Sequence, residues 1–173
     1  MRRLLVLPVT LVLLWAIVAE LNHALSGLHV HVFAGALFVG FSALTQPLRA
    51  GLAVSLFGGL LGDANAPVSF GTHLLLFAAA HLIIFHLRDR VPREDNIATI
   101  IVALFANFAL FLALSFVQIH RSPAPAAVWP RLIADLACSQ VLLAFVTPWF
   151  FALQARALAV VDTLAALHAR RQS

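Results

Sequence analysis

Long apolar runs separated by short polar breaks constrain this chain more than any other feature. The longest run covers residues 97–117 and is polar at few positions, such as Asn107 and Ser115. Its length matches the roughly 20 residues that a helix needs to cross the hydrocarbon core of a bilayer. The pattern predicts an all-α, polytopic membrane protein with a six-helix transmembrane bundle. The other five runs cover residues 4–19, 30–44, 51–61, 72–87 and 132–153.

The composition favours a membrane protein over a soluble domain. Hydrophobic residues make up 62% of the 173 positions and charged residues 10%, whereas a soluble domain is about 45–50% apolar and about 25% charged. Six spans use most of a chain this short, which leaves no room for a sizeable soluble catalytic domain. The single cysteine, Cys138, excludes an intramolecular disulfide framework.

The arginines predict the orientation. All eleven basic residues are arginines, and with the N-terminus inside and six alternating spans only Arg121 and Arg131 lie outside. Basic residues favour the cytoplasmic side, so we expect both termini in the cytoplasm and a lipid bilayer, not a nucleic acid, as the partner of these charges. Arg2 and Arg3 before an apolar run are also typical of a signal peptide, but no clean A-x-A cleavage site follows, which favours a retained first span.

Two segments differ from an ordinary span. Residues 51–61 form an apolar run of about eleven residues, which is the length of a re-entrant or buried segment. Residues 155–173 place apolar side chains at helical spacing beside three arginines, which is typical of an amphipathic helix on a membrane surface. We therefore expect a six-span domain over residues 1–154 and a basic cytoplasmic tail over residues 155–173.

Small residues recur along the third run and lead to Asp63 and a turn that ends at Gly71. Small side chains let helices approach closely, so we expect this strip to make a close contact within the bundle or with a partner. Asp63 either begins a solvated turn or lies on a helix N-terminus or a partner's arginine, and Ser69 or Thr72 would cap the following helix. The strip comprises Gly51, Ser55, Gly58, Gly59 and Gly62.

Polar side chains inside the predicted spans are costly and usually have a reason. Asn107 and Gln140 fall near the middle of the fifth and sixth runs, where we expect a hydrogen bond between them. Asp135 follows Arg131 by four residues, which predicts an ion pair on one helix face. Candidate helix-end residues are Arg88, Pro148 and Trp149.

Eight histidines raise the question of a metal site. His81 and His86 are five residues apart and His73 precedes His81 by eight, whereas two ligands on one helix need i, i+3 or i+4 spacing. We therefore expect no metal ion, and we interpret His81 as a buried hydrogen-bonding residue. The sequence lacks a nucleophile elbow, an H-E-x-x-H pair and a phosphate-binding loop, so we expect neither an enzyme nor a cofactor.

The order of these features resembles the rod shape-determining protein MreD family. A glycine-bearing helix runs into Asp63, a small-residue turn with Gly71 follows, and the next helix is closed by Arg88. Pro148 and Trp149, late in the last run, are similar to the family's C-terminal end. The resemblance implies a fold similar to that of the substrate-binding subunits of energy-coupling-factor transporters.

The resemblance also implies a function. It predicts a non-enzymatic inner-membrane component of the bacterial cell-elongation machinery, which acts in rod shape and peptidoglycan synthesis through an MreC-type bitopic partner. The alternative is a substrate-binding subunit of a vitamin-type membrane transporter. In that case Asn107, Asp135, Gln140 and His81 would line its pocket.

Overall fold

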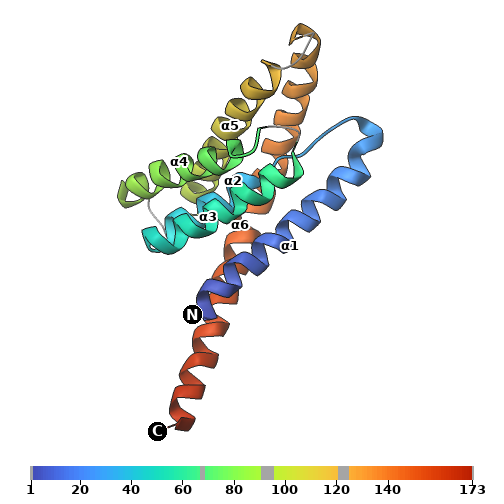
Figure 1. Cartoon of the computed structure of the whole chain (residues 1–173). Helices are drawn as coiled ribbons and strands as arrows, with labels where there is room; N and C mark the ends of the chain where they lie inside the picture. Colours follow the sequence, from blue (N-terminus) through green and yellow to red (C-terminus); the bar gives the residue numbers. More distant parts are fainter. Residues whose placement is uncertain (1, 67–68, 91–95, 121–124, 173) are drawn as a thin grey trace.

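The computed structural model describes the backbone of residues 2–66, 69–90, 96–120 and 125–172. Over these ranges the chain is helical and contains no strand, which confirms the all-α prediction. The helices follow one another along the chain as Figure 1 shows. They are α1 (Arg2–Leu25), η1 (Ser26–Leu28), α2 (Gly35–Thr45), α3 (Leu48–Asn65), α4 (Thr72–Leu87), η2 (Arg88–Arg90), α5 (Asn96–Ile119) and α6 (Pro125–Gln172).

Three of these helices contain apolar stretches long enough to cross a membrane. The stretches are Val6–Leu28, Ile97–Ile119 and Val128–Thr163, within or around α1, α5 and α6. Large apolar side chains are exposed along all three, for example Ile17, Phe105 and Phe145. Since such surface is stable in lipid and not in water, the structure supports the prediction of a membrane protein.

The second span starts later than the sequence predicts. The expected helix over residues 30–44 begins only at Gly35, and residues 30–34 are non-helical. At 1.5 Å per residue α2 alone is about 16 Å long, too short to cross a bilayer. Five extended residues can add about another 16 Å, so the two parts together match the hydrocarbon thickness.

The third span and the tail also differ from their predicted lengths. α3 has 18 residues instead of the eleven of residues 51–61, and its C-terminal extension includes Asp63, whose carboxylate finds partners inside the protein. α6 continues without a break through residues 154–155, so residues 155–172 extend the helix of the last run and do not form a short helix of their own. The physical reason is local: no glycine or proline follows Pro148 within α6, and Leu158 packs against the core cluster that includes Leu7 of α1.

α2 is the centre of the fold, since every residue from Gly35 to Leu44 is buried. One side of it packs with α1, α3 and α6 through a cluster that includes Leu11, Phe38 and Leu143. Another side packs with α4 and α5 through Val39, Phe77 and related residues. By contrast α1 is peripheral, because only 11% of its apolar stretch is buried. Figure 1 shows α1 beside α3, with its first turns alongside the C-terminal half of α6.

Candidate functional site

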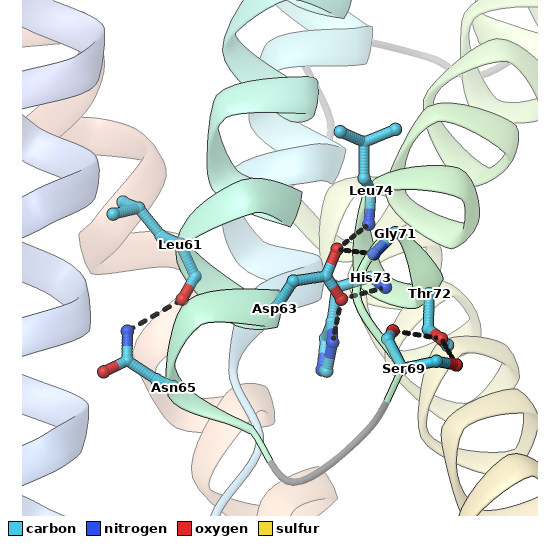
Figure 2. A network of polar contacts seen from close by, with 8 residues as sticks. All are labelled: Leu61, Asp63, Asn65, Ser69, Gly71, Thr72, His73 and Leu74. Atoms are coloured by element: carbon cyan, nitrogen blue, oxygen red, sulfur yellow. Dashed lines mark hydrogen bonds and ion pairs between the residues drawn. The ribbon is translucent and has the colours of Figure 1, made fainter.

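The α3–α4 hairpin is built around the carboxylate of Asp63, which is only 6% exposed (Figure 2). Its Oδ2 accepts hydrogen bonds from the backbone N–H of Gly71 at 2.8 Å and of Leu74 at 3.2 Å. Its Oδ1 accepts from the backbone N–H of His73 at 2.8 Å and lies 3.0 Å from the ring Nδ1 of the same residue. The last residues of α3 therefore satisfy the free N–H groups at the start of α4.

This arrangement decides between the two interpretations of Asp63 and corrects the expected cap. Asp63 lies on a helix N-terminus and not in a solvated turn. Ser69 and Thr72 do not cap α4; their hydroxyls lie 3.0 Å from one another. The N-cap residue is Gly71, at φ 94°, a left-handed conformation that glycine adopts without steric cost.

The small-residue strip of α3 makes its contacts inside the protein. A Cβ atom on Gly59 would overlap the backbone of Leu74, and one on Gly62 would lie 2.9 Å from the ring of His73. A Cβ atom on Gly58 would lie 3.3 Å from the side chain of Leu11 in α1. The strip is therefore a contact within the bundle, and it is not available to a partner.

A second buried polar cluster joins α2, α3 and α4. The Nδ1 atom of His81 lies 3.0 Å from the hydroxyl of Ser55 and 3.3 Å from that of Ser42, and the two hydroxyls are 3.0 Å apart. All three side chains are buried, as expected for His81. A Cβ on Gly51 would lie 2.6 Å from the His81 ring, so this glycine makes room for the cluster. Nothing in the sequence singles out Ser42, because a single serine in an apolar run carries no signal of its own.

Side chains from α1 and α6 hold the extended segment before α2. Asp135 Oδ1 accepts the backbone N–H of His31 at 2.8 Å, and the Ser139 hydroxyl accepts that of Phe33 at 3.0 Å. Between them, Asn22 bonds both the N–H and the carbonyl of Val32, at 2.7 and 3.0 Å. Residues four apart on a helix are about 6 Å apart along its axis, close to the spacing of alternate residues in an extended strand. Each N–H from His31 to Phe33 thus has a protein partner, which a non-helical segment would need if it lay inside a membrane.

The other polar residues predicted inside the spans have mixed outcomes. Arg131 Nε lies 3.9 Å from Asp135 Oδ2, in the expected i, i+4 pair. The expected hydrogen bond between Asn107 and Gln140 is wrong: Gln140 donates to the carbonyl of Leu104 at 3.1 Å. Asn107 is fully buried and neither of its side-chain polar atoms has a partner within the described part of the chain. Sequence spacing could not reveal this, because the relative rotation of two helices sets which side chains meet.

The helix-end residues lie apart from the hairpin site. Arg88 donates to the carbonyl of Gln46 at 3.1 Å and its guanidinium carbon lies 3.8 Å from the centre of the Phe85 ring. Arg88 therefore ties the end of α4 to the turn between α2 and α3. Pro148 and Trp149 lie within the continuous α6, and Trp149 is 80% exposed.

A cavity of about 590 Å³ lies between α1, the extended segment and the Asp63 hairpin. Its walls are mostly apolar, and its polar side chains come from helix ends (Asn22, Asn65 and His73) and from the extended segment (His31). None of Asn107, Asp135, Gln140 and His81 lines it. This cavity is therefore not the pocket that the transporter alternative predicts.

Over the part of the chain that the structure describes, no three His, Cys, Asp or Glu side chains come close enough to hold a metal ion. Compared with protein-family models, with curated proteins and with solved structures, the chain shows no match in any of the three.

Proposed function

We propose that this protein is a non-catalytic, multi-pass component of the bacterial cell-elongation machinery that binds an MreC-type bitopic partner in the cytoplasmic membrane. The proposal includes six spans, both termini in the cytoplasm and a helical arrangement similar to the substrate-binding subunits of energy-coupling-factor transporters. The observation that carries it is the α3–α4 hairpin, since this is the segment on which the MreD resemblance rests.

The geometry gives the hairpin residues of the resemblance a physical role. Asp63 caps α4 from the neighbouring helix, and Gly71 takes up the left-handed turn that brings the N–H groups to the carboxylate. Gly59 and Gly62 let the two helices approach until their backbones nearly touch. Asp63, Gly71, Gly59 and Gly62 together hold the two helices of the hairpin in place, which is a structural and not a catalytic role.

The same geometry narrows where a partner helix would bind. Because the small residues of α3 contact other helices of the bundle, we expect the partner to bind a surface that faces lipid. α5 and α6 offer exposed aromatic side chains for this, including Phe105, Phe108 and Phe145. In lipid such an association depends on close packing and not on the hydrophobic effect.

Depletion in the rod-shaped native host tests the proposal. We expect cells to lose their rod shape and a tagged copy of the full chain to co-purify an MreC-type protein. Rod-shaped cells after depletion, together with a purified complex that lacks such a protein, would contradict it.

A pair of glycine variants links this phenotype to the hairpin. Gly59→Ala places a methyl group against the backbone of Leu74, whereas Gly27→Ala has no atom within 4 Å of the added carbon. We expect Gly27→Ala to restore rods in depleted cells and Gly59→Ala to restore them poorly. Equal rescue by the two variants, with equal amounts of both proteins in the membrane, would show that the function does not depend on the packing of the hairpin.

A further inference from the structure

The cavity beside α1 has the form of a site for an elongated, amphipathic molecule. Along α1 its lining runs from Leu11 to Asn22, which is about 16 Å of helix. Opposite lie the extended segment and the end of α3, including Phe33 and Leu61. Its volume of about 590 Å³ falls in the range of about 300–1,000 Å³ that is usual for small-molecule sites.

Polarity changes along the length of this cavity. The wall from Leu11 to Val18 is apolar, whereas Asn22 lies near the end of α1 and Asn65 is the last residue of α3. His73, in the first turn of α4, also lines the cavity, with its ring beside Gly62, about one turn of α3 before Asn65. No Asp, Glu or Arg side chain lines the cavity. A ligand that fits would therefore be apolar along most of its length and carry an uncharged polar group at the helix-end side.

One wall of the cavity exists without any ligand. Asn22, Asp135 and Ser139 take up the N–H groups of the extended segment, so this wall needs no bound molecule to satisfy them. The facing wall, α1, is the peripheral helix of the fold and is largely exposed. The extended segment thus forms a fixed wall, and α1 closes the cavity on the side that borders on lipid. An amphiphile would enter from the lipid past α1.

His73 supplies a hydrogen-bond acceptor at the polar end. Its ring Nδ1 lies 3.0 Å from the Asp63 carboxylate, which can only accept, so Nδ1 carries the hydrogen. In the neutral ring Nε2 is then a bare acceptor. His73 is 95% buried, lines the cavity and has no partner for Nε2 among the described residues. The Asp63 network therefore both caps α4 and fixes the tautomer that a ligand would meet.

We propose that this cavity binds a lipid-like amphiphile, with one hydrocarbon chain along α1 and an uncharged head whose hydroxyl or amide N–H donates to His73 Nε2. The site does not depend on the proposed role in cell elongation. The site is tested on the purified protein, by a measurement that does not depend on cell shape.

The test uses two photoactivatable probes in nanodiscs of phosphatidylcholine: a monoacylglycerol and a lysophosphatidylglycerol that carry the same diazirine-bearing chain. We expect the monoacylglycerol to label peptides from residues 11–22 and 61–66 about five-fold more than the charged probe, the effect of about one hydrogen bond. Labelling spread evenly over the exposed faces of α1, α5 and α6 would show bulk lipid only and overturn the proposal. Preference for the charged probe would also overturn it.

Variants separate the cavity from the membrane surface. Ala19→Trp fills the cavity, while Ala24→Trp adds the same bulk on α1 outside it. We expect labelling of these peptides to fall at least about five-fold in Ala19→Trp and to stay unchanged in Ala24→Trp. Equal labelling of the two variants would contradict the site.

A third variant tests the head group. His73→Asn keeps a donor near the position of Nδ1 for Asp63 and removes the Nε2 acceptor. The ratio of labelling by monoacylglycerol to labelling by the charged probe should therefore fall to about one, while both probes still label the cavity peptides. An unchanged preference would remove His73 from the proposal. Size-exclusion behaviour equal to that of the parent protein shows that the variant is folded.

Discussion

At the scale of single residues, Asp63 is the clearest case of a side chain that stabilises a neighbouring element. Its carboxylate is bonded by three backbone N–H groups and one imidazole in a nearly water-free setting. Hydrogen bonds to a charged acceptor are stronger than neutral ones, and buried donors left without a partner are costly.

We therefore expect Asp63→Ala to lower the free energy of unfolding by about 2 kcal/mol. Denaturant titration of the protein in detergent micelles, followed by circular dichroism, measures the change. Asp89→Ala is the matched control because the Asp89 side chain is 80% exposed, and its effect should stay below about 1 kcal/mol. Similar losses for the two variants would mean that the Asp63 network does not stabilise the fold.

The close approach of α3 and α4 at Gly59 leads to a second prediction. A methyl group there collides with backbone atoms of Leu74, which cannot rotate away as a side chain can. Gly59→Ala should cost about 1–3 kcal/mol of stability, whereas Gly27→Ala, in open space, should cost less than about 0.5 kcal/mol. The same micelle titration compares them, and a neutral Gly59→Ala would show that the helices separate easily.

Asn107 gives the opposite expectation, because it is a polar side chain whose removal should not harm stability. Its amide is fully buried with neither polar atom bonded, so a leucine of similar size loses no hydrogen bond. We expect Asn107→Leu to leave the free energy of unfolding unchanged or raise it by about 1 kcal/mol. Gln140→Leu, which removes the bond to the Leu104 carbonyl, is the comparison. A loss of stability in Asn107→Leu would indicate a bound water or ligand at this amide.

At the scale of the elements, the second apolar run folds into an extended segment followed by the short helix α2. The segment persists because three side chains from two other helices bond its N–H groups in turn. Each bond serves one residue of the segment, so each can be removed separately.

Hydrogen exchange at single-residue resolution tests this division. Ser139→Ala should raise the exchange rate of the Phe33 amide about ten-fold while that of Val32 changes little, because the Val32 amide is bonded by Asn22. Asn22→Leu should do the reverse. If both variants loosened the whole segment equally, the segment would be held by packing and not by these bonds.

At the scale of the whole molecule, the N-terminal half of α1 lies beside the C-terminal half of α6. Thr10 of α1 donates to Gln154 of α6 at 3.0 Å, and α1 and α6 run side by side near this point (Figure 1). α6 has 48 residues, about 72 Å of helix, which is more than twice the hydrocarbon thickness. A helix of this length is expected to extend beyond the bilayer, and in the proposed orientation the part outside lies in the cytoplasm.

Cysteine accessibility tests the proposed orientation. In a Cys138→Ala background, Gly27→Cys lies between α1 and α2 and Arg90→Cys follows α4. A membrane-impermeant maleimide should label Gly27→Cys in spheroplasts and label Arg90→Cys only after lysis. Labelling of both in intact spheroplasts would contradict six spans with cytoplasmic termini.

The sequence was sufficient to predict that the chain is helical and suited to a membrane, because burial in lipid is a property of long apolar runs that needs no tertiary contact. It also located Asp63 and the glycines as one constrained segment. It could not show the start of α2 at Gly35, because the N–H groups before it are satisfied by side chains more than a hundred residues away as well as by Asn22.

Only the tertiary structure decided which polar groups meet. Whether Asn107 faces Gln140, whether the small-residue strip turns inward and whether Asp63 reaches α4 all depend on how helices rotate and cross. Those angles come from packing of the whole set of side chains, so local sequence holds little information about them. The cavity beside α1 has the same origin, since it is the space left where a peripheral helix and an extended segment do not pack closely together.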